Sequence, residues 1–557
     1  MDKKILFIGV NSSYSHTMLS YGYLRSFNEV HLPTFSWDYL ECTVKEDIHL
    51  ILDKVKDLKP DIITGTLYIF NHSYFVELLA QLKELLPKLQ IYLGGPEFLG
   101  DNESFLRTHE HINGVIRGDE TSFYKLFTNV PINEVNGLCC LDGKGYIDNG
   151  FSRFWGRLDD LPSPYQKGYL VKGKPFYQLE TSRGCNGNCT FCTSSVSSSV
   201  NELSLSAINK ELVALSDLGC KEVRVVDRTF NANKKRAIKM LELFRDKFSN
   251  MNFHLEVNPA ILDEKFLELL SSFPKNRLHI EIGVQTLNDD VLRVIKRPAT
   301  SQKQLEGLKS LLELNNFEVH ADLISGLPNQ SYQDVISDLV KLVNISPHEI
   351  QLETLKLLPG TPLRKIAEEY SIKFNKYPLY EVLETSTMNF KELIKLRHLS
   401  KMIDSFYNTP ELQSIFIFSL TRDTDFIIKF LEFFIKSTPA FQKVSLRKRF
   451  LILFEYFKEI GDSVSYELLK FAWFISGFSP DYFGVKVRKI HQDMPEFATI
   501  WNADNISQES KRYFICEFSY NVDELYLNRN VVLEKVHKEY VFEMQHSHKV
   551  NKVGIIN

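Results

Sequence analysis

A regular alternation of strand-like and helix-like segments constrains this 557-residue chain more than any other feature. Such alternation predicts βαβ units and a parallel sheet. Six βα units are too few for a closed eight-stranded barrel, so the pattern predicts a partial (βα)6 barrel of the TIM type. The six expected strands are Phe176–Ser182, Glu222–Asp227, Phe253–Asn258, Leu278–Gln285, Val319–Gly326 and Glu349–Lys356.

An earlier series of the same kind occupies the start of the chain. Its expected strands are Lys4–Val10, Asp61–Tyr68, Ile91–Gly95 and Gly114–Asp119. Short apolar strands with intervening helices predict a Rossmann-like, doubly wound parallel sheet, which binds ligands at the carboxyl ends of its strands. After the barrel, glycine becomes rare and helical periodicity dominates. The α/β chain therefore divides into a sheet domain (1–150), a linker (151–175), the barrel (176–365) and a mainly helical domain (366–557).

The overall charge and hydropathy exclude several classes of partner. The formal net charge is −4, so there is no basic footprint for nucleic acid or an anionic membrane. No apolar stretch is long enough to span a bilayer, and no cleavage site follows the apolar run Ile5–Val10. We expect a cytoplasmic protein that binds neither nucleic acid nor membrane.

Three of the eight cysteines form a compact motif, Cys185-x3-Cys189-x2-Cys192, directly after the first barrel strand. A structural zinc ion needs four ligands, and no fourth Cys or His lies nearby. Three thiolates on a cubane cluster leave one iron open to chelate a substrate. The motif thus favours a [4Fe–4S] cluster over zinc or over cysteines that are neighbours by chance. A non-catalytic iron–sulfur protein is a further alternative, which requires a fourth ligand such as Cys220.

These residues resemble a known family. The run Cys185-x3-Cys189-x-Phe191-Cys192 is similar to the motif of the radical S-adenosylmethionine (SAM) superfamily, and GVQT (283–286) and GLPN (326–329) are similar to two of its phrases. The resemblance implies cleavage of SAM to a 5′-deoxyadenosyl radical, and an electron donor of the flavodoxin or ferredoxin type. The three cysteines would then be catalytic cluster ligands.

Polar residues at the barrel strand ends are candidates for SAM binding. A polar side chain at the mouth of a buried strand needs a partner, and a ligand can provide it. The alternative for each is a capping or barrel-lining role. The usual two-glycine stretch after the second strand is not recognisable in this chain. The expected SAM contacts are Phe191, Asp227, Glu256, Glu281, Gln285 and Asp322.

A doubly wound domain before such a barrel resembles the cobalamin-binding subgroup of the superfamily, as do the phrases GGPE (94–97) and RGDE (117–120). The subgroup's Asp-x-His-x2-Gly motif is absent, so a histidine ligand to cobalt is not predicted from it. The domain could instead serve packing or substrate binding, and His16 could merely stabilise its loop. The expected cobalamin contacts are His16, Thr66, Gly94, Gly95 and Glu97.

With cobalamin, the resemblance implies methylation of an unactivated carbon in a small-molecule or peptide substrate. Cyclisation or rearrangement, as in the anaerobic magnesium-protoporphyrin ester cyclase, is the alternative reaction. The helical C-terminal domain contains no motif that predicts a substrate.

Overall fold

The computed structural model describes residues 3–143, 145–154, 156–196, 199–437, 444–490, 494–503, 510, 512–528, 532–545 and 549–556. Their contacts divide the chain into two units. The first comprises Met1–Val335 and Thr354–Leu393, and the second comprises Ile336–Glu353 and Ile394–Asn557. Both units are therefore built from two separate stretches of the sequence.

The first unit begins with a seven-stranded sheet of order β2-β1-β3-β4-β5-β6-β7. The first five strands are parallel, and β6 and β7 add an antiparallel hairpin. This confirms the predicted doubly wound sheet. Its strands are β1 (Lys4–Asn11), β2 (Ser36–Thr43), β3 (Ile62–Thr66), β4 (Gln90–Gly94), β5 (Gly114–Ile116), β6 (Leu138–Asp142) and β7 (Gly145–Asp148). Its helices are α1 (Leu19–His31), α2 (Ile48–Leu58), α3 (His72–Leu85) and α4 (Glu103–Thr108).

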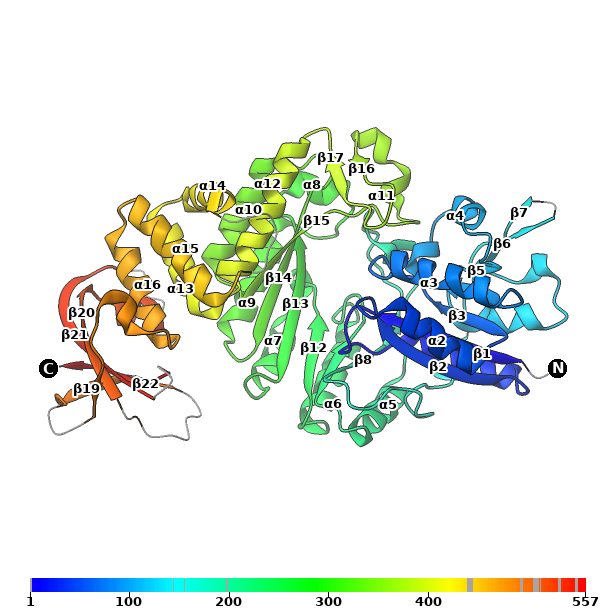
Figure 1. The fold of residues 1–557 in the computed structure, drawn as a ribbon, viewed down its shortest axis with the longest axis horizontal. Helices are drawn as coiled ribbons and strands as arrows, with labels where there is room; N and C mark the ends of the chain where they lie inside the picture. Colours follow the sequence, from blue (N-terminus) through cyan, green and yellow to red (C-terminus); the bar gives the residue numbers. More distant parts are fainter. Residues whose placement is uncertain are drawn as a thin grey trace. The chain divides into compact units, whose positions relative to one another are not determined.

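A second parallel sheet has the order β15-β14-β13-β12-β11-β8, so strands that follow one another in the sequence are neighbours. In Figure 1 its labelled strands β12 to β15 lie side by side in green. This is the predicted partial barrel with all six strands. They are β8 (Tyr177–Leu179), β11 (Glu222–Val225), β12 (Asn252–Glu256), β13 (Leu278–Gln285), β14 (Glu318–Ser325) and β15 (Glu349–Thr354). Helices α5 (Leu205–Asp217), α6 (Lys234–Asp246), α7 (Glu264–Ser271), α8 (Asp289–Val294), α9 (Ser301–Glu313) and α10 (Tyr332–Ile345) alternate with them.

The barrel strands have two unlike faces. Along β13 and β14 buried and half-buried residues alternate, as the period of two requires. The buried face packs on helices: Phe253 of β12 stacks on Phe244 of α6, with ring centroids 4.0 Å apart. The half-buried face therefore points into the barrel, and it carries the polar residues of these strands.

The second unit combines helices with an antiparallel sheet of order β18-β20-β21-β22-β19. The predicted helical character is confirmed, and two of the strands lie where the sequence is strand-like, near 512–516 and 538–544. Its helices are α12 (Phe390–Met402), which begins in the first unit, α13 (Pro410–Arg422), α14 (Phe426–Ser437), α15 (Leu446–Glu459), α16 (Ser463–Ile475) and α17 (Val522–Leu527). Its strands are β18 (Arg488–Lys489), β19 (Phe497–Asn502), β20 (Arg512–Tyr520), β21 (Lys535–Met544) and β22 (Val550–Ile556).

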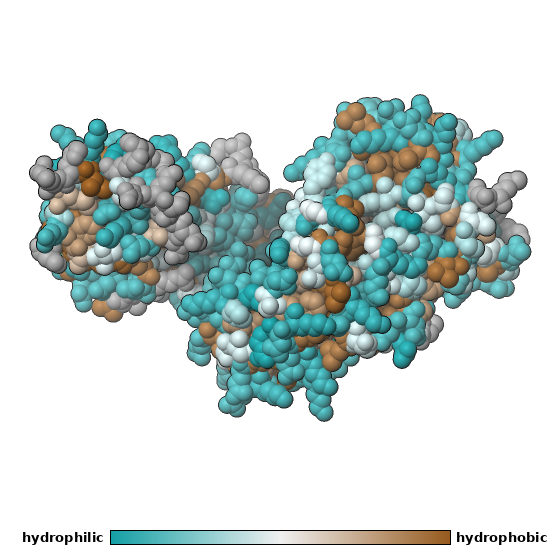
Figure 2. Space-filling model, turned by 90° about the horizontal axis from the view of Figure 1, so that it is seen from below, coloured by the Kyte–Doolittle hydropathy of each residue, from teal (hydrophilic) through white to brown (hydrophobic). Residues whose placement is uncertain are grey.

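Among the described residues, no helix is long and apolar enough to cross a membrane. On the face drawn in Figure 2, hydrophilic residues predominate and hydrophobic ones are interspersed among them.

Candidate active site

A small antiparallel strand pair closes the loop that carries the three cysteines. β9 (Ser182–Arg183) precedes the loop, β10 (Asn201–Glu202) follows it, and the two strands pair with each other. Gly184 has a φ of +92°, and a Cβ there would lie 2.1 Å from the carbonyl oxygen of Ser199. Only glycine fits this backbone. The glycine before Cys185 is thus a requirement of the loop.

The inside of the loop suits sulfur ligands of a cluster. A Cβ on Gly187 would lie 3.3 Å from Cys185 Sγ and 3.9 Å from Cys189 Sγ, so this glycine leaves a cradle beside two sulfurs. The backbone N–H groups of Gly187 and Ser194 donate to Cys185 Sγ and Cys192 Sγ at 3.3 and 3.4 Å. Hydrogen bonds of this kind tune iron–sulfur clusters. Within the described part of the chain, no three His, Cys, Asp or Glu residues are arranged to hold a single metal ion.

The cysteine loop contacts the carboxyl ends of barrel strands. Arg297 Nη1 lies 3.8 Å from Cys189 Sγ, and the same guanidinium donates to the carbonyl oxygen of Gly283 on β13. Cys185 Sγ lies 4.0 Å from the hydroxyl of Thr229, which follows β11. Burial raises the pKa of the Cys189 thiol, and the charge of Arg297 opposes the shift. The loop therefore sits at the barrel mouth, with a cation beside one thiol.

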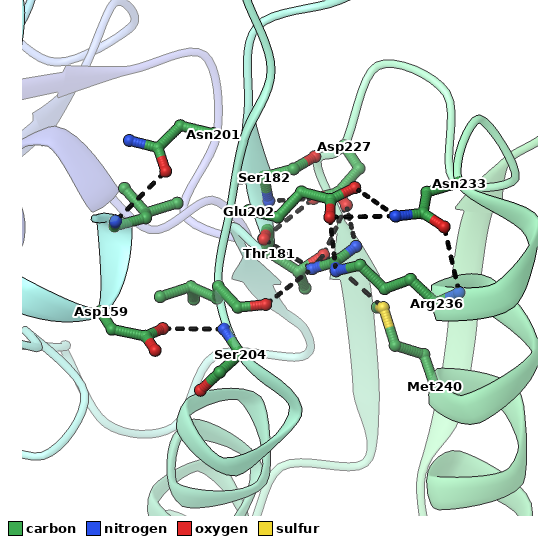
Figure 3. Close-up of polar contacts among 12 residues, drawn as sticks. Asp159, Thr181, Ser182, Asn201, Glu202, Ser204, Asp227, Asn233, Arg236 and Met240 are labelled. Atoms are coloured by element: carbon green, nitrogen blue, oxygen red, sulfur yellow. Dashed lines mark hydrogen bonds and ion pairs between the residues drawn. The ribbon is translucent and has the colours of Figure 1, made fainter. Parts of the chain in front are cut away.

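Asp227 anchors the backbone that leads into this loop. Its buried carboxylate accepts hydrogen bonds from the N–H groups of Thr181 and Ser182, both at 2.9 Å, and from the Thr181 hydroxyl. Arg236 lies 3.6 Å from Asp227 and donates to the carbonyl oxygen of Thr181 at 2.7 Å. Figure 3 shows these side chains converging on Asp227. The carboxylate already has protein partners, and its predicted contact with SAM stays a prediction.

Arg183 joins the cysteine loop to the N-terminal sheet domain. Its Nη1 lies 3.0 and 3.2 Å from the two carboxylate oxygens of Glu120, in the RGDE phrase. Its Nε lies 2.9 Å from Glu180, and its guanidinium carbon lies 4.8 Å from the ring centroid of Tyr23. Burial raises the pKa of Glu180, and the positive charge of Arg183 opposes this upward shift. This arginine, two residues before Cys185, thus pairs with acids of both domains.

The barrel interior brings together three of the predicted SAM contacts. Glu256 on β12 pairs in register with Glu281 on β13, and Gly283 pairs with Asp322 on β14. Burial and then the Glu281 charge raise the pKa of Glu256 to about 7. Burial also raises the pKa of Asp322. The pKa of Glu281 is lowered, first by a hydrogen bond from His254.

Gln285 and Phe191 lie at the same mouth. Gln285 ends β13 with a φ of +69°, where the pairing with β14 shifts register. A Cβ on Gly283 would lie 2.3 Å from Gln285 Nε2, so the amide covers the glycine. Positive φ at a non-glycine residue is a conformation that functional sites often hold. Phe191 is half-buried within the cysteine loop.

The predicted cobalamin contacts of the N-terminal sheet lie at its carboxyl edge, but they differ in how much room each leaves for a ligand. Thr66 ends β3 and donates to Ser20 at 2.8 Å. A Cβ on Gly94 would meet only one backbone oxygen, at 3.6 Å, so Gly94 allows a close approach. Gly95 has a φ of +119° and packs against Leu67, whose carbonyl oxygen would lie 2.5 Å from a Cβ.

Two further predicted cobalamin contacts pack toward the barrel. Glu97 is buried and accepts a hydrogen bond of 2.7 Å from the hydroxyl of Tyr380. His16 Nδ1 lies 3.0 Å from the Ser13 hydroxyl, and its ring meets Phe176 edge-on at 5.4 Å. Burial lowers the pKa of His16. The structure therefore gives both residues protein partners, and their role toward cobalamin stays a prediction.

The edge of the N-terminal sheet and the barrel mouth meet at Arg228. Burial raises the pKa of Tyr68, in the loop after β3, and the charge of Arg228 opposes the shift. Arg228 also opposes the raised pKa of Glu256 inside the barrel. Tyr68 stacks on Phe70 at 5.3 Å, and Phe70 is 42% exposed. Arg228 thus lies close to both surfaces, and an aromatic pair stands on the edge beside it.

Comparison with known protein families agrees with this geometry. The family described as the Radical SAM superfamily matches residues 179–342, which contain the cysteine loop and most of the barrel. The chain carries a radical SAM domain. The predicted radical SAM domain is thus confirmed over these residues, and a domain of this kind implies a [4Fe–4S] cluster and SAM as its cofactors. Residues 368–556 match a second family, described as a protein of unknown function (DUF4080).

Relatives extend the similarity beyond the radical SAM domain. An uncharacterized methyltransferase from Pyrococcus horikoshii is 26% identical over 400 residues, which are 67% of this chain and 84% of that one. TokK, a cobalamin-dependent radical SAM methyltransferase from Streptomyces tokunonensis, is 22% identical over 403 residues, 67% of this chain and 58% of TokK. The chain therefore spans little more than half of TokK.

Solved structures share the fold. The cobalamin-dependent SAM radical enzyme OxsB, with aqua-cobalamin bound, has a TM-score of 0.58 at 16% identity and covers 85% of this chain and 79% of its own. The radical SAM methyltransferase TsrM from Kitasatospora setae, with tryptophan and a SAM analogue bound, has a TM-score of 0.55 at 15% identity, with 67% and 79% covered. The predicted combination of a doubly wound sheet and a partial barrel is confirmed.

Four residues of this site were not predicted from the sequence. Arg183, Arg228, Arg297 and His254 all place a charge or a hydrogen bond at the mouth or in the interior. Arg183 stands next to the motif, and its charge beside a predicted cluster could have been noted. The other three are distant from the cysteines in the sequence, and no local pattern marks them.

Proposed function

We propose that this protein methylates an unactivated carbon of a small-molecule or peptide substrate, using cobalamin together with its cluster and SAM. The observation that carries the proposal is that the charge of Arg228 acts on Tyr68 at the carboxyl edge of the N-terminal sheet and on Glu256 inside the barrel, while the next residue, Thr229, lies 4.0 Å from Cys185 of the cysteine loop. TokK, which is similar to 67% of this chain, is named a cobalamin-dependent radical SAM methyltransferase. When bound, the cluster and SAM supply a 5′-deoxyadenosyl radical, and cobalamin supplies the methyl group.

The residues have distinct roles in this proposal. Cys185, Cys189 and Cys192 hold the cluster, and the cradle at Gly187 accommodates it. Gln285 and the acidic side chains of the barrel hold SAM at the mouth. Gly94 and Thr66 form the floor for the corrin, with Tyr68 and Phe70 as an aromatic wall. A flavodoxin- or ferredoxin-type protein of the cytoplasm provides the electron.

Two alternatives have less support. Among the similar proteins named above, those with an assigned reaction are methyltransferases, which does not favour cyclisation. A non-catalytic iron–sulfur protein needs a fourth ligand. Cys220 lies before β11, at the end of the strand opposite the cysteine loop, and its thiol donates to the carbonyl oxygen of Glu222 at 3.2 Å.

Anaerobic reconstitution with iron and sulfide, followed by dithionite and SAM, tests the proposal. We expect 5′-deoxyadenosine from the wild-type protein and none from Cys185→Ala. Cys220→Ala is the matched control, because it removes a buried thiol outside the loop, and it should keep at least half of the activity. Equal product from the wild type and Cys185→Ala would refute the cluster assignment.

Hydroxocobalamin tests the second cofactor. After gel filtration, the wild-type protein should retain cobalamin in about one equivalent, visible in its absorption spectrum. Gly94→Phe should lose it, since the large side chain fills the space above β4 while the cluster content stays unchanged. If the wild-type protein retained no cobalamin, the proposed methylation would be refuted, although the protein could still cleave SAM.

A further inference from the structure

The turn after β4 of the N-terminal sheet packs on the chain that follows the last barrel strand. This turn, residues 95–100, contains most of the GGPE phrase and is called the GGPE turn below. A Cβ on Gly360, which has a φ of +78°, would lie 2.4 Å from the carbonyl oxygen of Leu99. A Cβ on Gly100 would lie 3.0 Å from the backbone nitrogen of Gly360. A side chain at either glycine would therefore force the two backbones apart.

A buried polar contact accompanies this close approach. Glu97 of the GGPE turn is buried and accepts a hydrogen bond of 2.7 Å from the hydroxyl of Tyr380, which is buried as well. Among the described residues, no other side chain donates to this carboxylate. The guanidinium carbon of Arg364 lies 4.7 Å from the centroid of the Tyr380 ring, and its charge opposes the rise that burial causes in the pKa of Glu97. The turn thus depends on one donor and one cation from beyond the barrel.

Backbone hydrogen bonds fix both of these residues. Arg364 lies in α11 (Pro362–Lys365), and its Nη1 donates to the carbonyl oxygen of Leu357 at 2.8 Å. The N–H of Leu357 donates in turn to the carbonyl oxygen of Tyr380 at 2.9 Å. Arg364 and Tyr380 therefore approach the GGPE turn from a single hydrogen-bonded stretch of chain.

The same short helix also holds the cysteine loop. The N–H of Leu363, the residue before Arg364, donates to the carbonyl oxygen of Thr190 at 2.8 Å. Thr190 follows Cys189 directly, and its own N–H donates to the carbonyl oxygen of Ile295 at 3.0 Å. The cluster loop and the GGPE turn thus share one support, the chain around α11.

We infer that Tyr380 and Arg364 are positioning residues, which hold the GGPE turn in the conformation that binds cobalamin beside Gly94. Glu97 then anchors the turn and does not contact the cofactor. The inference rests on the proposed function, because it concerns the cobalamin site of that proposal. It also gives a role to the start of the segment that matches the family of unknown function, since Tyr380 lies within residues 368–556.

Loss of the Tyr380 hydroxyl shows how the anchor would fail. The Glu97 carboxylate would stay buried without a donor, which is costly. The turn could avoid this cost only by opening to water or by taking up a proton at Glu97. Because Gly94 directly precedes the turn, either change disturbs the surface that receives the corrin.

Cobalamin binding tests the inference without turnover. The reconstituted protein, free of reductant, is dialysed to equilibrium against hydroxocobalamin. Tyr380→Phe and Arg364→Met should each raise the Kd about tenfold, the size expected when a buried polar group loses its partner. Iron content and SAM binding should stay at the wild-type values. Tyr377→Phe is the matched control, because it removes the same atom from the same stretch of chain, but Tyr377 is 78% exposed. It should bind like the wild type.

A double variant separates anchoring from direct contact. Replacement of both partners by apolar groups leaves no buried polar group unpaired. If Glu97 only anchors the turn, Tyr380→Phe combined with Glu97→Met should bind cobalamin about threefold or more tightly than Tyr380→Phe alone. If Glu97 contacts cobalamin, the double variant should bind more weakly than the single one. A residue that merely stabilises the fold would change the unfolding free energy but not these affinities.

Several results would overturn the inference. They are Tyr380→Phe protein that binds cobalamin like the wild type, a double variant that binds more weakly than Tyr380→Phe, and an equal loss in Tyr377→Phe. Tyr380→Phe removes a single oxygen atom, so it decides the question even if Arg364→Met fails to fold. Failure of the proposed methylation is recognised separately, because the wild-type protein would then bind no cobalamin at all.

Discussion

At the scale of single residues, Glu256 is the titrating group with the clearest consequence for stability. Its pKa in the folded protein is about 7, raised by burial and by Glu281, whereas an unfolded glutamate has a pKa of about 4.3. The folded state therefore binds the Glu256 proton more tightly than the unfolded state does. The resulting contribution to the unfolding free energy is complete below about pH 4 and is lost as the pH rises through 7.

A neutral replacement removes this dependence. From pH 5 to pH 8 the wild type should lose about 1–3 kcal/mol of unfolding free energy relative to Glu256→Gln, since each unit of pKa shift corresponds to about 1.4 kcal/mol. Urea unfolding at the two pH values measures the difference. Glu268→Gln, a surface control, should stay within about 0.5 kcal/mol of the wild type at both. Parallel curves for the wild type and Glu256→Gln would contradict the raised pKa.

Residue patterns differ in what they reveal before a structure is known. The spacing of Cys185, Cys189 and Cys192 predicts the cluster by itself, because all three ligands lie in one short loop of the sequence. Arg297 is 108 residues from Cys189, its partner, and only the βα fold brings them together. The acids Glu256, Glu281 and Asp322 were predictable as strand-end residues. Their pairing with His254 and His320 was not, because it depends on the register between strands.

At the scale of elements, Arg183 couples the strand pair around the cysteine loop to the N-terminal domain. Arg183→Met would leave Glu120 and Glu180 without their shared cation. Removal of one partner from a largely buried ion pair costs about 2–4 kcal/mol. We expect a loss of this size in unfolding free energy, together with a lower iron content after reconstitution.

Arg157→Met provides the comparison, because the Arg157 side chain is 78% exposed and pairs with nearby Asp160. Exposed ion pairs contribute little, so we expect the unfolding free energy of this variant to match that of the wild type. Chemical denaturation measures the unfolding free energy of both variants, and iron analysis measures their cluster content. An Arg183→Met protein with wild-type stability and iron content would show that the link is dispensable.

Most elements followed from the sequence pattern, but three strands of the N-terminal sheet, β2, β6 and β7, were missed. All six barrel strands are recognisable because their outer faces are apolar. β2 is an edge strand of its sheet, and its Asp38 and Glu41 are only half-buried. An edge strand loses less by carrying charge. The seven-stranded sheet was therefore predicted in type but not in its full extent.

At the scale of the whole molecule, the interleaving of the two units bears on which fragments can fold. The second unit contains 336–353, which includes most of α10 and β15, and also 394–557. Within this unit, Asn408 donates to the carbonyl oxygen of Ile350 and accepts from its N–H, both at 2.9 Å. Gln413 donates to the carbonyl oxygen of His348 at 2.9 Å. The C-terminal helices thus hold the start of a barrel strand.

A chain that ends at Leu393 would lose these partners of β15. Unpaired buried backbone groups cost about 1–3 kcal/mol each, and the apolar side of 336–353 would face water. We expect the truncated protein to be insoluble or to reconstitute less than a fifth of the cluster, measured as iron per chain. Asn408→Ala in the full chain should show the graded form of the effect, a loss of about 1–3 kcal/mol. A soluble fragment with full cluster content would mean that the barrel folds without the C-terminal helices. Their role would then be to bind the substrate rather than to stabilise the barrel.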